Sequence, residues 1–438
     1  MNILSVPGGQ KLDGMVYVSG AKNGALPLLA LSLLASDIMY ISNLPVLTDT
    51  QAMMDLLKHY GMVVDLDTLN NKVSLDPANL ANNNRNCYVA SKIRASIWLL
   101  APLLVRFGCA TLPLPGGDAI GAKGSGVRKI DLHIALLEKM GAKISSANGY
   151  IQATLEGKLQ ATNFIFNKVS VGATINAILA CVMAQGVSCI ENCAIEPEIV
   201  DMCECLIKMG AIIEGVGSRV LKITGVDQLG ATEHKVIPDR IEAATYMMMA
   251  AITAGRVEIV GIASHMLESF CAKLIAAGAQ VEYQNQRILV TGSRSILPVN
   301  VSTAPFPGFV TDLQAQFTSL MALCSGSCYI EENLYENRFM HVAELNKMGA
   351  NITIDGNRAN IVGVQSLKGA TVYASDIRAS VCLLMAGLIA SGTTMIKDAY
   401  HLSRGYENFI GKLALCGVKV EFILPEEQYQ LGAISDVV

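Results

Sequence analysis

Two patterns of apolar and polar positions recur six times each along the chain. The first is an amphipathic helix that ends in glycine and leads into an apolar strand, as in LLEKMGAKI and ELNKMGANI. After the first interval these glycines follow at a spacing of about 70 residues, at Gly61, Gly141, Gly210, Gly278, Gly349 and Gly417. Glycine just past the last helical turn is typical of a left-handed C-cap. The pattern therefore predicts six helices that each end in such a cap.

The second pattern is a small polar start followed by a long apolar helix. The starts are Ser19, Ser91, Ser170, Pro238, Thr311 and Ser375. A helix that is apolar all round must be buried, whereas one with a polar face lies at a surface. Six such units predict a repeat fold with six buried and six exposed helices in two halves of three units. We expect Ser, Thr or Asp to cap the buried helices, whose N-termini favour anions where they converge.

The composition indicates a large buried core. The chain has 438 residues, of which 52% are hydrophobic and 16% charged, enough for two or three domains. The net charge of −4 argues against a general nucleic-acid binder. The longest apolar runs, such as Ala25–Ala35 and Val381–Ala390, are shorter than the ~18–20 residues that a membrane span needs.

The cysteines and the N-terminus favour a cytoplasmic protein without a metal. The N-terminus lacks the pattern of a signal peptide, and twelve cysteines at irregular spacing are expected to be reduced thiols. Neither Cys189-x-x-x-Cys193 nor Cys203-x-Cys205 has a standard zinc spacing, so we expect core thiols there. No phosphate-binding motif of the P-loop type is present, and we expect no cofactor.

One glycine-rich stretch carries candidate chemistry. Residues Pro115 to His133 read PGGDAIGAKGSGVRKIDLH, between a strand-like run and a helical pattern. The stretch contains Asp118 and the cations Lys123, Arg128 and Lys129. Long loops of this kind are functional or simply solvated, and both readings stand for this segment alone. Clustered Lys and Arg side chains suit an anionic ligand.

Short motifs in series along the whole chain resemble the UDP-N-acetylglucosamine 1-carboxyvinyltransferase family, which are enolpyruvyl transferases. In the first half they are SGAKN from Ser19, RASIW from Arg94, PGG from Pro115, KVSVGAT from Lys168, EPEIVD from Glu196 and PDRIE from Pro238. In the second half they are TDLQAQ from Thr311, ENRFMH from Glu336, DIRAS from Asp376 and HLSRGYE from His401. Many motifs in the same order are more specific than any one of them.

The resemblance implies an α/β fold of two domains, the inside-out α/β barrel of the enolpyruvyl transferases. It has six repeated β-α-β-α-β-β units and an active site in the inter-domain cleft. The domain with the catalytic loop would span residues 22–236. The second, discontinuous domain would comprise residues 1–21 and 237–438.

The resemblance also implies a transferase of alkyl groups other than methyl. The enolpyruvyl group of phosphoenolpyruvate would move to the 3-hydroxyl of UDP-N-acetylglucosamine by addition and elimination, releasing phosphate. This is the first committed step of peptidoglycan precursor synthesis, hence a role in cell wall biogenesis, cell shape and division. The expected partners are these two small molecules, with neither nucleic acid nor membrane. A monomer would suffice, and the oligomeric state is left open.

Residue by residue, the resemblance assigns two binding sets. Phosphoenolpyruvate would be held by Lys22, Arg128 and Arg404 at the phosphate and by Arg338 and Arg378 at the carboxylate. The nucleotide sugar would be bound by Lys22, Asn23, Arg94, Arg128, Lys129, Ile130, Asp131, Leu132, Lys168, Val169, Ser170, Val171, Asp312 and Leu334. Any single arginine could instead form an ordinary surface ion pair, but the full series of motifs favours the site.

The catalytic assignments are Asp118, Asp312, Lys22, Arg404 and Asp376. Asp312 is the candidate general base for the sugar hydroxyl, and Asp376 matches a family position at the reacting centre. The alternative for both aspartates is a helix N-cap, and Asp312 could do both.

The sequence departs from the family at the proton donor. Asp118 stands where most members have cysteine, although a minority carries aspartate. An aspartate that acts as an acid near neutral pH needs a raised pKa. The drug fosfomycin alkylates the usual cysteine, and a carboxylate is a weaker nucleophile than a thiolate, so we expect insensitivity. The loop is also longer than usual; Arg128 aligns with the family arginine, and Lys123 is the alternative.

Two other functions compete with this interpretation. The first is 5-enolpyruvylshikimate-3-phosphate synthase, which shares the fold and the donor but needs a different set of residues for its acceptor. The second is a non-catalytic repeat scaffold that binds a nucleotide. Asp118 is the feature that suggests a scaffold. The scaffold is disfavoured by the retention of the other predicted site residues, which are Lys22, Asp312, Arg338, Asp376, Arg378 and Arg404.

Overall fold

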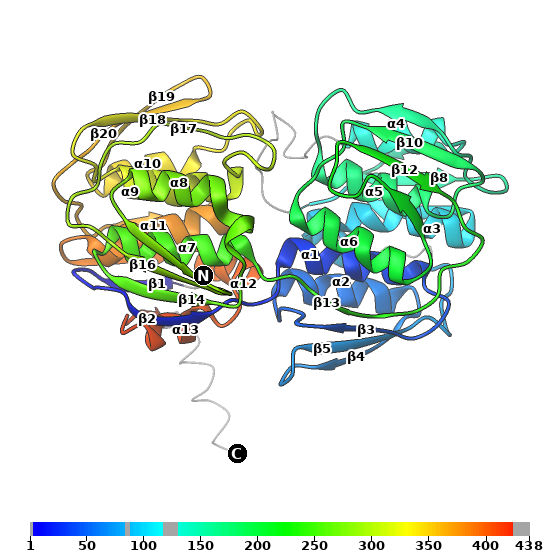
Figure 1. The fold of residues 1–438 in the computed structure, drawn as a ribbon, viewed down its shortest axis with the longest axis horizontal. Coiled ribbons are helices and arrows are strands. Elements are labelled where there is room, and N and C mark those ends of the chain that lie inside the picture. The colour runs from blue at the N-terminus through cyan, green and yellow to red at the C-terminus, as the bar shows by residue number, and fades with distance from the viewer. Residues whose placement is uncertain (1–2, 84–87, 117–129, 424–438) are drawn as a thin grey trace, which may run out of the picture. The chain divides into compact units, whose positions relative to one another are not determined.

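The chain forms two compact units (Figure 1). The computed structural model describes residues 3–83, 88–116 and 130–423. The continuous unit is Ser19–Asp239, and the discontinuous unit joins Met1–Val18 to Arg240–Val438. The N-terminal segment belongs to the discontinuous unit because its two strands are paired there. Strand β1 (Ile3–Pro7) runs antiparallel to β22 (Thr393–Lys397) and β23 (Glu421–Ile423).

The continuous unit has three small sheets. Their strand orders are β13-β3-β5-β4, β6-β8-β7 and β11-β12-β10-β9. The strands are β3 (Met39–Ser42), β4 (Val63–Asp67), β5 (Lys72–Asp76), β6 (Cys109–Pro113), β7 (Lys143–Ala147), β8 (Tyr150–Thr154), β9 (Asn163–Ile165), β10 (Val187–Glu191), β11 (Ile212–Glu214), β12 (Val220–Thr224) and β13 (Glu233–Lys235). The helices are α1 (Lys22–Leu31), α2 (Thr48–His59), η3 (Arg94–Leu99), α3 (Leu100–Phe107), α4 (Asp131–Lys139), α5 (Val171–Cys181) and α6 (Pro197–Lys208).

The discontinuous unit has three further sheets. Their strand orders are β15-β16-β14-β2, β17-β18-β20-β19 and β21-β22-β1-β23. The remaining strands are β2 (Asp13–Tyr17), β14 (Arg256–Val260), β15 (Gln280–Gln284), β16 (Arg287–Thr291), β17 (Val301–Ser302), β18 (Ser327–Glu331), β19 (Asn351–Asp355), β20 (Arg358–Val362) and β21 (Thr371–Tyr373). The helices are α7 (Arg240–Ile252), α8 (Glu268–Ala276), η5 (Thr311–Leu313), α9 (Gln314–Met321), α10 (Met340–Lys347), α11 (Ile377–Ile389), η6 (Ala399–His401), α12 (Leu402–Gly405) and α13 (Phe409–Leu415).

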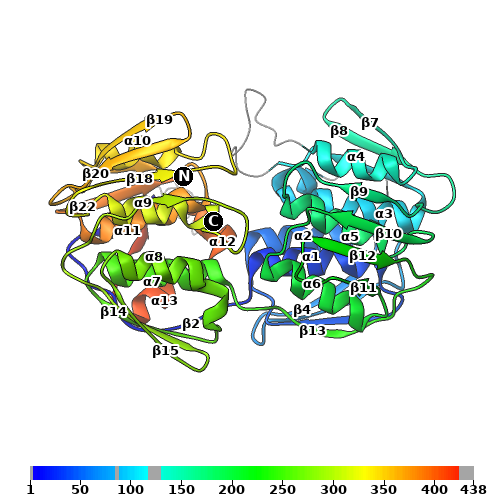
Figure 2. The same ribbon diagram turned by 45° about the horizontal axis from the view of Figure 1, so that its top comes forward.

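Helices form the interior of each unit and sheets form its outside (Figures 1 and 2). In the discontinuous unit, α7 and α9 are buried at every position and α11 from Ile377 to Leu388. In the continuous unit, α1 and α5 are buried along most of their length. Helices with a polar face, such as α6 and α10, alternate with these along the chain. This arrangement confirms the predicted repeat of buried and amphipathic helices.

The predicted glycine caps are confirmed. At all six positions the backbone φ angle is positive, from 76° at Gly417 to 104° at Gly141. A residue with a Cβ rarely adopts this conformation, so glycine lets each amphipathic helix turn directly into its following strand. None of the helices in the described ranges is long and apolar enough to cross a membrane.

The predicted helix starts are right in only some repeats. Ser170 caps α5, because its Oγ accepts the N–H of Ala173 at 3.3 Å. Helix α11 is capped by Asp376 rather than by Ser375. Helix α1 begins at Lys22, with Ala21 as its N-cap, so Ser19 is not the cap. The carbonyl of Ser19 instead accepts a hydrogen bond from the N–H of Asp239 at 2.9 Å. This bond holds the chain at Ser19 in an extended conformation before α1 begins.

Candidate functional site

The carboxylate of Asp312 lies between two buried arginines of the discontinuous unit. Arg338 donates from Nη2 to Oδ1 at 2.6 Å, and Arg378 donates from Nη2 to Oδ2 at 2.7 Å. The arginines are only 7% and 6% exposed, so these charge-assisted bonds are little screened. Asp312 is therefore committed to the arginines and is not the N-cap of α9, which is Leu313.

Arg338 has a second hydrogen-bond partner besides Asp312. Its Nη1 donates to Thr311 Oγ1 at 2.7 Å, and that hydroxyl donates to Glu332 Oε2 at 2.7 Å. Burial lowers the pKa of Arg338, but the carboxylates of Asp312 and Glu332 raise it more, so the guanidinium stays charged. Glu332 Oε1 also accepts the backbone N–H of Leu334 at 2.9 Å, which places this predicted residue beside the same network.

Asp376 lies at the first turn of α11 and is ionised. Its Oδ1 accepts the N–H groups of Arg378 and Ala379 at 2.8 and 3.0 Å. Burial acts to raise the pKa of Asp376. The hydrogen bonds of Ala379 and Ser375 and the positive charge of Arg338 lower the pKa more, so it falls below its usual value. Asp376 therefore caps α11, and at neutral pH it has no proton to donate, while its predicted place at the reacting centre stays a prediction.

His341, which the sequence analysis did not single out, is a buried neutral neighbour of this group. Burial and the charge of Arg338 lower its pKa to about 4, although Asp376 acts in the opposite direction. Its Nε2 has no hydrogen-bond partner among the described residues. The signal available in the sequence was its place in the ENRFMH motif at the start of α10.

Arg404 lies on α12, which packs against α11. Its Nη1 donates to His401 Nδ1 at 3.3 Å. A Cβ on Gly405 would come within 2.6 Å of Ile377 Cγ2, so glycine permits this close approach. The contact sets Arg404 next to the first turn of α11, which carries Arg378. Besides Leu334, the discontinuous unit thus gathers five of the predicted residues: Asp312, Arg338, Asp376, Arg378 and Arg404.

In the continuous unit, Lys22 is the first residue of α1. Its Nζ lies 3.6 Å from Oδ2 of Asp49 on α2, and its side chain is 12% exposed. Its backbone N–H donates to Asp239 Oδ2 at 3.2 Å. Asn23 follows on the same turn and is half-buried. Two carboxylates therefore fix the position of this lysine from both its main chain and its side chain.

A buried histidine links the other predicted segments of this unit. His133, on α4, accepts at Nδ1 from the amide of Asn176 on α5 at 3.2 Å. Trp98 Nε1 donates to the carbonyl of Gly172 at 3.2 Å, which joins η3 to the first turn of α5. Burial and the charge of Arg94 lower the pKa of His133 to about 3. Arg94, the start of α4 and the start of α5 are therefore close to one another.

The remaining predicted residues differ in accessibility. Asp131 and Lys168 are exposed, Ile130 and Leu132 are buried, and Val169, Ser170 and Val171 are half-buried. A residue with a buried aliphatic side chain can contact a ligand only through its backbone groups or by apolar packing. Asp118, Lys123, Arg128 and Lys129 lie outside the described residues.

The glycine at position 116, near the start of the glycine-rich stretch, is required by a close contact that the sequence did not reveal. A Cβ on Gly116 would come 1.6 Å from the carbonyl oxygen of Ser91. Only glycine fits this contact, which places Gly116 against the chain that leads to Arg94.

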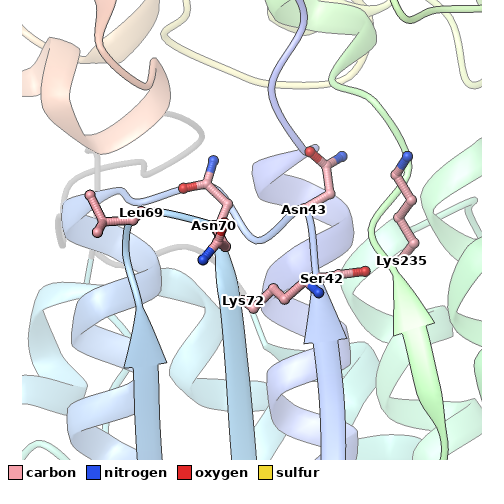
Figure 3. A pocket seen from close by; sticks show the side chains of 7 residues that line it. Ser42, Asn43, Leu69, Asn70, Lys72 and Lys235 are labelled. Carbon is pink, nitrogen blue, oxygen red and sulfur yellow. The ribbon is translucent and has the colours of Figure 1, made fainter.

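A surface cavity of about 430 Å³ lies elsewhere on the continuous unit (Figure 3). It is lined by Ser42, Asn43, Leu69, Asn70, Asn71, Lys72 and Lys235. None of the predicted site residues lines it. Across the part of the chain that the structure describes, no group of three His, Cys, Asp or Glu side chains could hold a metal ion.

Comparison with known proteins decides the family. Residues 6–413 match the family model of EPSP synthase (3-phosphoshikimate 1-carboxyvinyltransferase). A UDP-N-acetylglucosamine 1-carboxyvinyltransferase of Rickettsia bellii is 49% identical over 423 residues, which are 96% of this chain and 100% of that protein. The enzymes of that name from Rickettsia akari and Rickettsia prowazekii are 49% and 48% identical, with the same coverage. The chain belongs to the UDP-N-acetylglucosamine 1-carboxyvinyltransferase family.

Solved structures confirm the enolpyruvyl transferase fold. The enolpyruvyl transferase NikO from Streptomyces tendae matches with a TM-score of 0.88 at 23% identity, covering 97% of this chain and 99% of that one. EPSP synthase from Acinetobacter baumannii matches with a TM-score of 0.74 at 18% identity, covering 97% of this chain and all of the other. At these identities the likeness concerns the fold alone.

The buried neutral His133 predicts a loss of stability in acid. The unfolded chain takes up a proton as the pH falls below the ordinary value of 6.5, whereas folded His133 does so only near 3. The unfolded state thus binds more protons between these values, and stability is lost as the pH falls through this window. At a pH one unit below 6.5 the loss is about 1.4 kcal/mol for this group.

Urea unfolding near pH 7 and near pH 5.5 checks this prediction. His133→Gln removes the titrating group, so the free energy of unfolding of this variant should fall by about 1.3 kcal/mol less than that of the unaltered protein between these two pH values. His265→Gln, at an exposed histidine, is the matched control and should leave the pH dependence unchanged. An equal pH dependence in His133→Gln and the unaltered protein would contradict the assignment.

Proposed function

We propose that this protein transfers the enolpyruvyl group of phosphoenolpyruvate to the 3-hydroxyl of UDP-N-acetylglucosamine and releases phosphate. The observation that carries the proposal is the arginine pair around Asp312, in a chain about half identical to enzymes of that name. We infer a cytoplasmic role in the first committed step of peptidoglycan precursor synthesis, and through it in cell wall biogenesis, cell shape and division.

The two arginines have the chemistry to hold the donor carboxylate. Each directs one Nη2 at a carboxylate oxygen, 2.6 and 2.7 Å away at Asp312. The carboxylate of phosphoenolpyruvate offers the same two oxygens with the same charge. Lys22, Arg404 and Arg128 are the proposed phosphate ligands. The nucleotide sugar is assigned to the segments around Asn23, Arg94, Ile130–Leu132 and Lys168–Val171.

The aspartates take different parts in the proposed reaction. The oxygen of the sugar 3-hydroxyl attacks the central carbon of phosphoenolpyruvate, and Asp312 accepts the proton that this hydroxyl loses. Asp118 protonates the methylene carbon in the same step. A proton then leaves the new methyl group as the phosphate departs, which restores the double bond. Ionised Asp376 is unsuited to the acid step, and its capping of α11 orients the helix that carries Arg378.

Phosphate release by the purified protein tests the proposal. We expect release with phosphoenolpyruvate and UDP-N-acetylglucosamine, and none with shikimate 3-phosphate, the acceptor of the alternative enzyme. Because Asp118 must be protonated, the rate should fall as the pH rises through one ionisation. Arg378→Lys keeps the charge but loses the planar guanidinium that donates to the carboxylate and to Tyr406 at the same time, so it should lower kcat/KM for phosphoenolpyruvate about 100-fold.

Arg256→Lys is the control, because Arg256 is exposed on the strand β14 of the same unit and should tolerate the change. Release with shikimate 3-phosphate instead would identify the other enzyme of this fold. Tight binding of the nucleotide sugar without phosphate release in the presence of either acceptor would indicate a binding module and contradict the proposed enzyme.

Fosfomycin tests the role of Asp118 separately. The unaltered enzyme should keep its activity after brief exposure to the drug, because a carboxylate is a poor nucleophile toward the epoxide. Asp118→Cys should remain active and become irreversibly inhibited, whereas Asp118→Asn should lose activity without gaining sensitivity. Irreversible loss of activity in the unaltered enzyme would contradict the predicted insensitivity.

A further inference from the structure

Arg378 is held by a residue that the sequence analysis did not select. Its Nη1 donates to the hydroxyl of Tyr406 at 3.1 Å, while its Nη2 donates to Asp312. The ring of Tyr406 lies 5.7 Å from the guanidinium carbon, a cation–π distance. Tyr406 follows α12 and is 2% exposed. One terminal nitrogen of the guanidinium is therefore bonded to Asp312 and the other to Tyr406.

Three neighbours fix the orientation of the Tyr406 hydroxyl. Gln316 Nε2, on α9, donates to it at 3.3 Å. Thr245 Oγ1, on α7, lies 3.1 Å from it and already donates its proton to the carbonyl of Ile241 at 2.8 Å. The tyrosine can therefore donate to Thr245 while it accepts from Arg378 and from Gln316, whose Nε2 also lies 3.3 Å from Thr245 Oγ1 and 3.0 Å from the carbonyl oxygen of Asp312.

The two partners of Arg378 differ in how easily they can be replaced. The Asp312 side chain is 23% exposed, and its carboxylate chemistry is the same as that of a substrate carboxylate. The Tyr406 hydroxyl is buried and bonded to two interior helices. An incoming carboxylate can therefore take the place of Asp312 but not that of Tyr406.

We propose that Tyr406 is a positioning residue, which keeps Arg378 aimed at the substrate carboxylate when that carboxylate replaces Asp312. This inference rests on the proposed function. Thr311, itself bonded to Glu332, does the same for Arg338. The exchange also frees Asp312 from both arginines, so that donor binding makes the general base available for the acceptor hydroxyl.

Steady-state kinetics of Tyr406→Phe test the proposal, because this change removes one oxygen and keeps the ring. The KM for phosphoenolpyruvate should rise about tenfold, as expected for losing a hydrogen bond to a charged group. The KM for UDP-N-acetylglucosamine should stay unchanged, whereas the urea midpoint should fall, because the change leaves buried donors of Arg378 and Gln316 without this acceptor. Tyr373→Phe removes an exposed hydroxyl, bonded to Lys397 on a strand of the same unit, and should alter neither constant.

A double variant shows whether Tyr406 acts through Arg378. If it does, adding Tyr406→Phe to Arg378→Lys should raise the KM for phosphoenolpyruvate by much less than tenfold. An unchanged KM in Tyr406→Phe, an equal rise for both substrates, or a full additional effect in the double variant would overturn the proposal.

Calorimetry separates this proposal from the reaction itself. If the unaltered protein released no phosphate, the proposed function would fail, yet direct binding of phosphoenolpyruvate would still report on the contact. Tyr406→Phe should then bind phosphoenolpyruvate about tenfold more weakly than the unaltered protein. Equal affinities would overturn the positioning role.

Discussion

The placement of Asp312 between Arg338 and Arg378 is the constraint on which the discontinuous unit depends. Two buried guanidinium groups that lie close to each other destabilise the fold unless an anion lies between them. Asp312 supplies it from η5, while the arginines come from the segment before α10 and from the first turn of α11. The packing of α11 against α9 therefore has to keep the first turn of α11, with Arg378, beside η5, with Asp312.

The surroundings of this group set the protonation states that an anion site requires. Arg338 keeps its charge, Asp376 stays ionised, and His341 stays neutral with a pKa of about 4. In the continuous unit, His133 is likewise neutral beside Arg94, so neither histidine adds a mobile charge near neutral pH. Positive charge is concentrated on arginines, whose planar groups match carboxylates and phosphates.

The sequence predicted the repeat, the buried helices and the glycine caps, because apolar periodicity and glycine placement are local signals. It located helix starts less well, since the pairing of Ser19 with Asp239 overrides a capping preference. The motifs also selected the five residues that converge in the discontinuous unit. They did not reveal the partners, since no spacing shows that Tyr406 contacts Arg378 or that His133 contacts Asn176. A polar residue in an apolar helix, such as Gln316, was the available sign of such contacts.

The central claim is that Asp312 and the substrate carboxylate compete for the same two arginines. The most direct measurement is the Kd of phosphoenolpyruvate by calorimetry for the unaltered protein and for Asp312→Asn. It is made with an analogue of UDP-N-acetylglucosamine that lacks the 3-hydroxyl, so that neither protein can react. Removing the competing charge should tighten binding about tenfold, although Asp312→Asn should be unable to turn over the natural acceptor. Equal or weaker binding in Asp312→Asn would contradict the exchange.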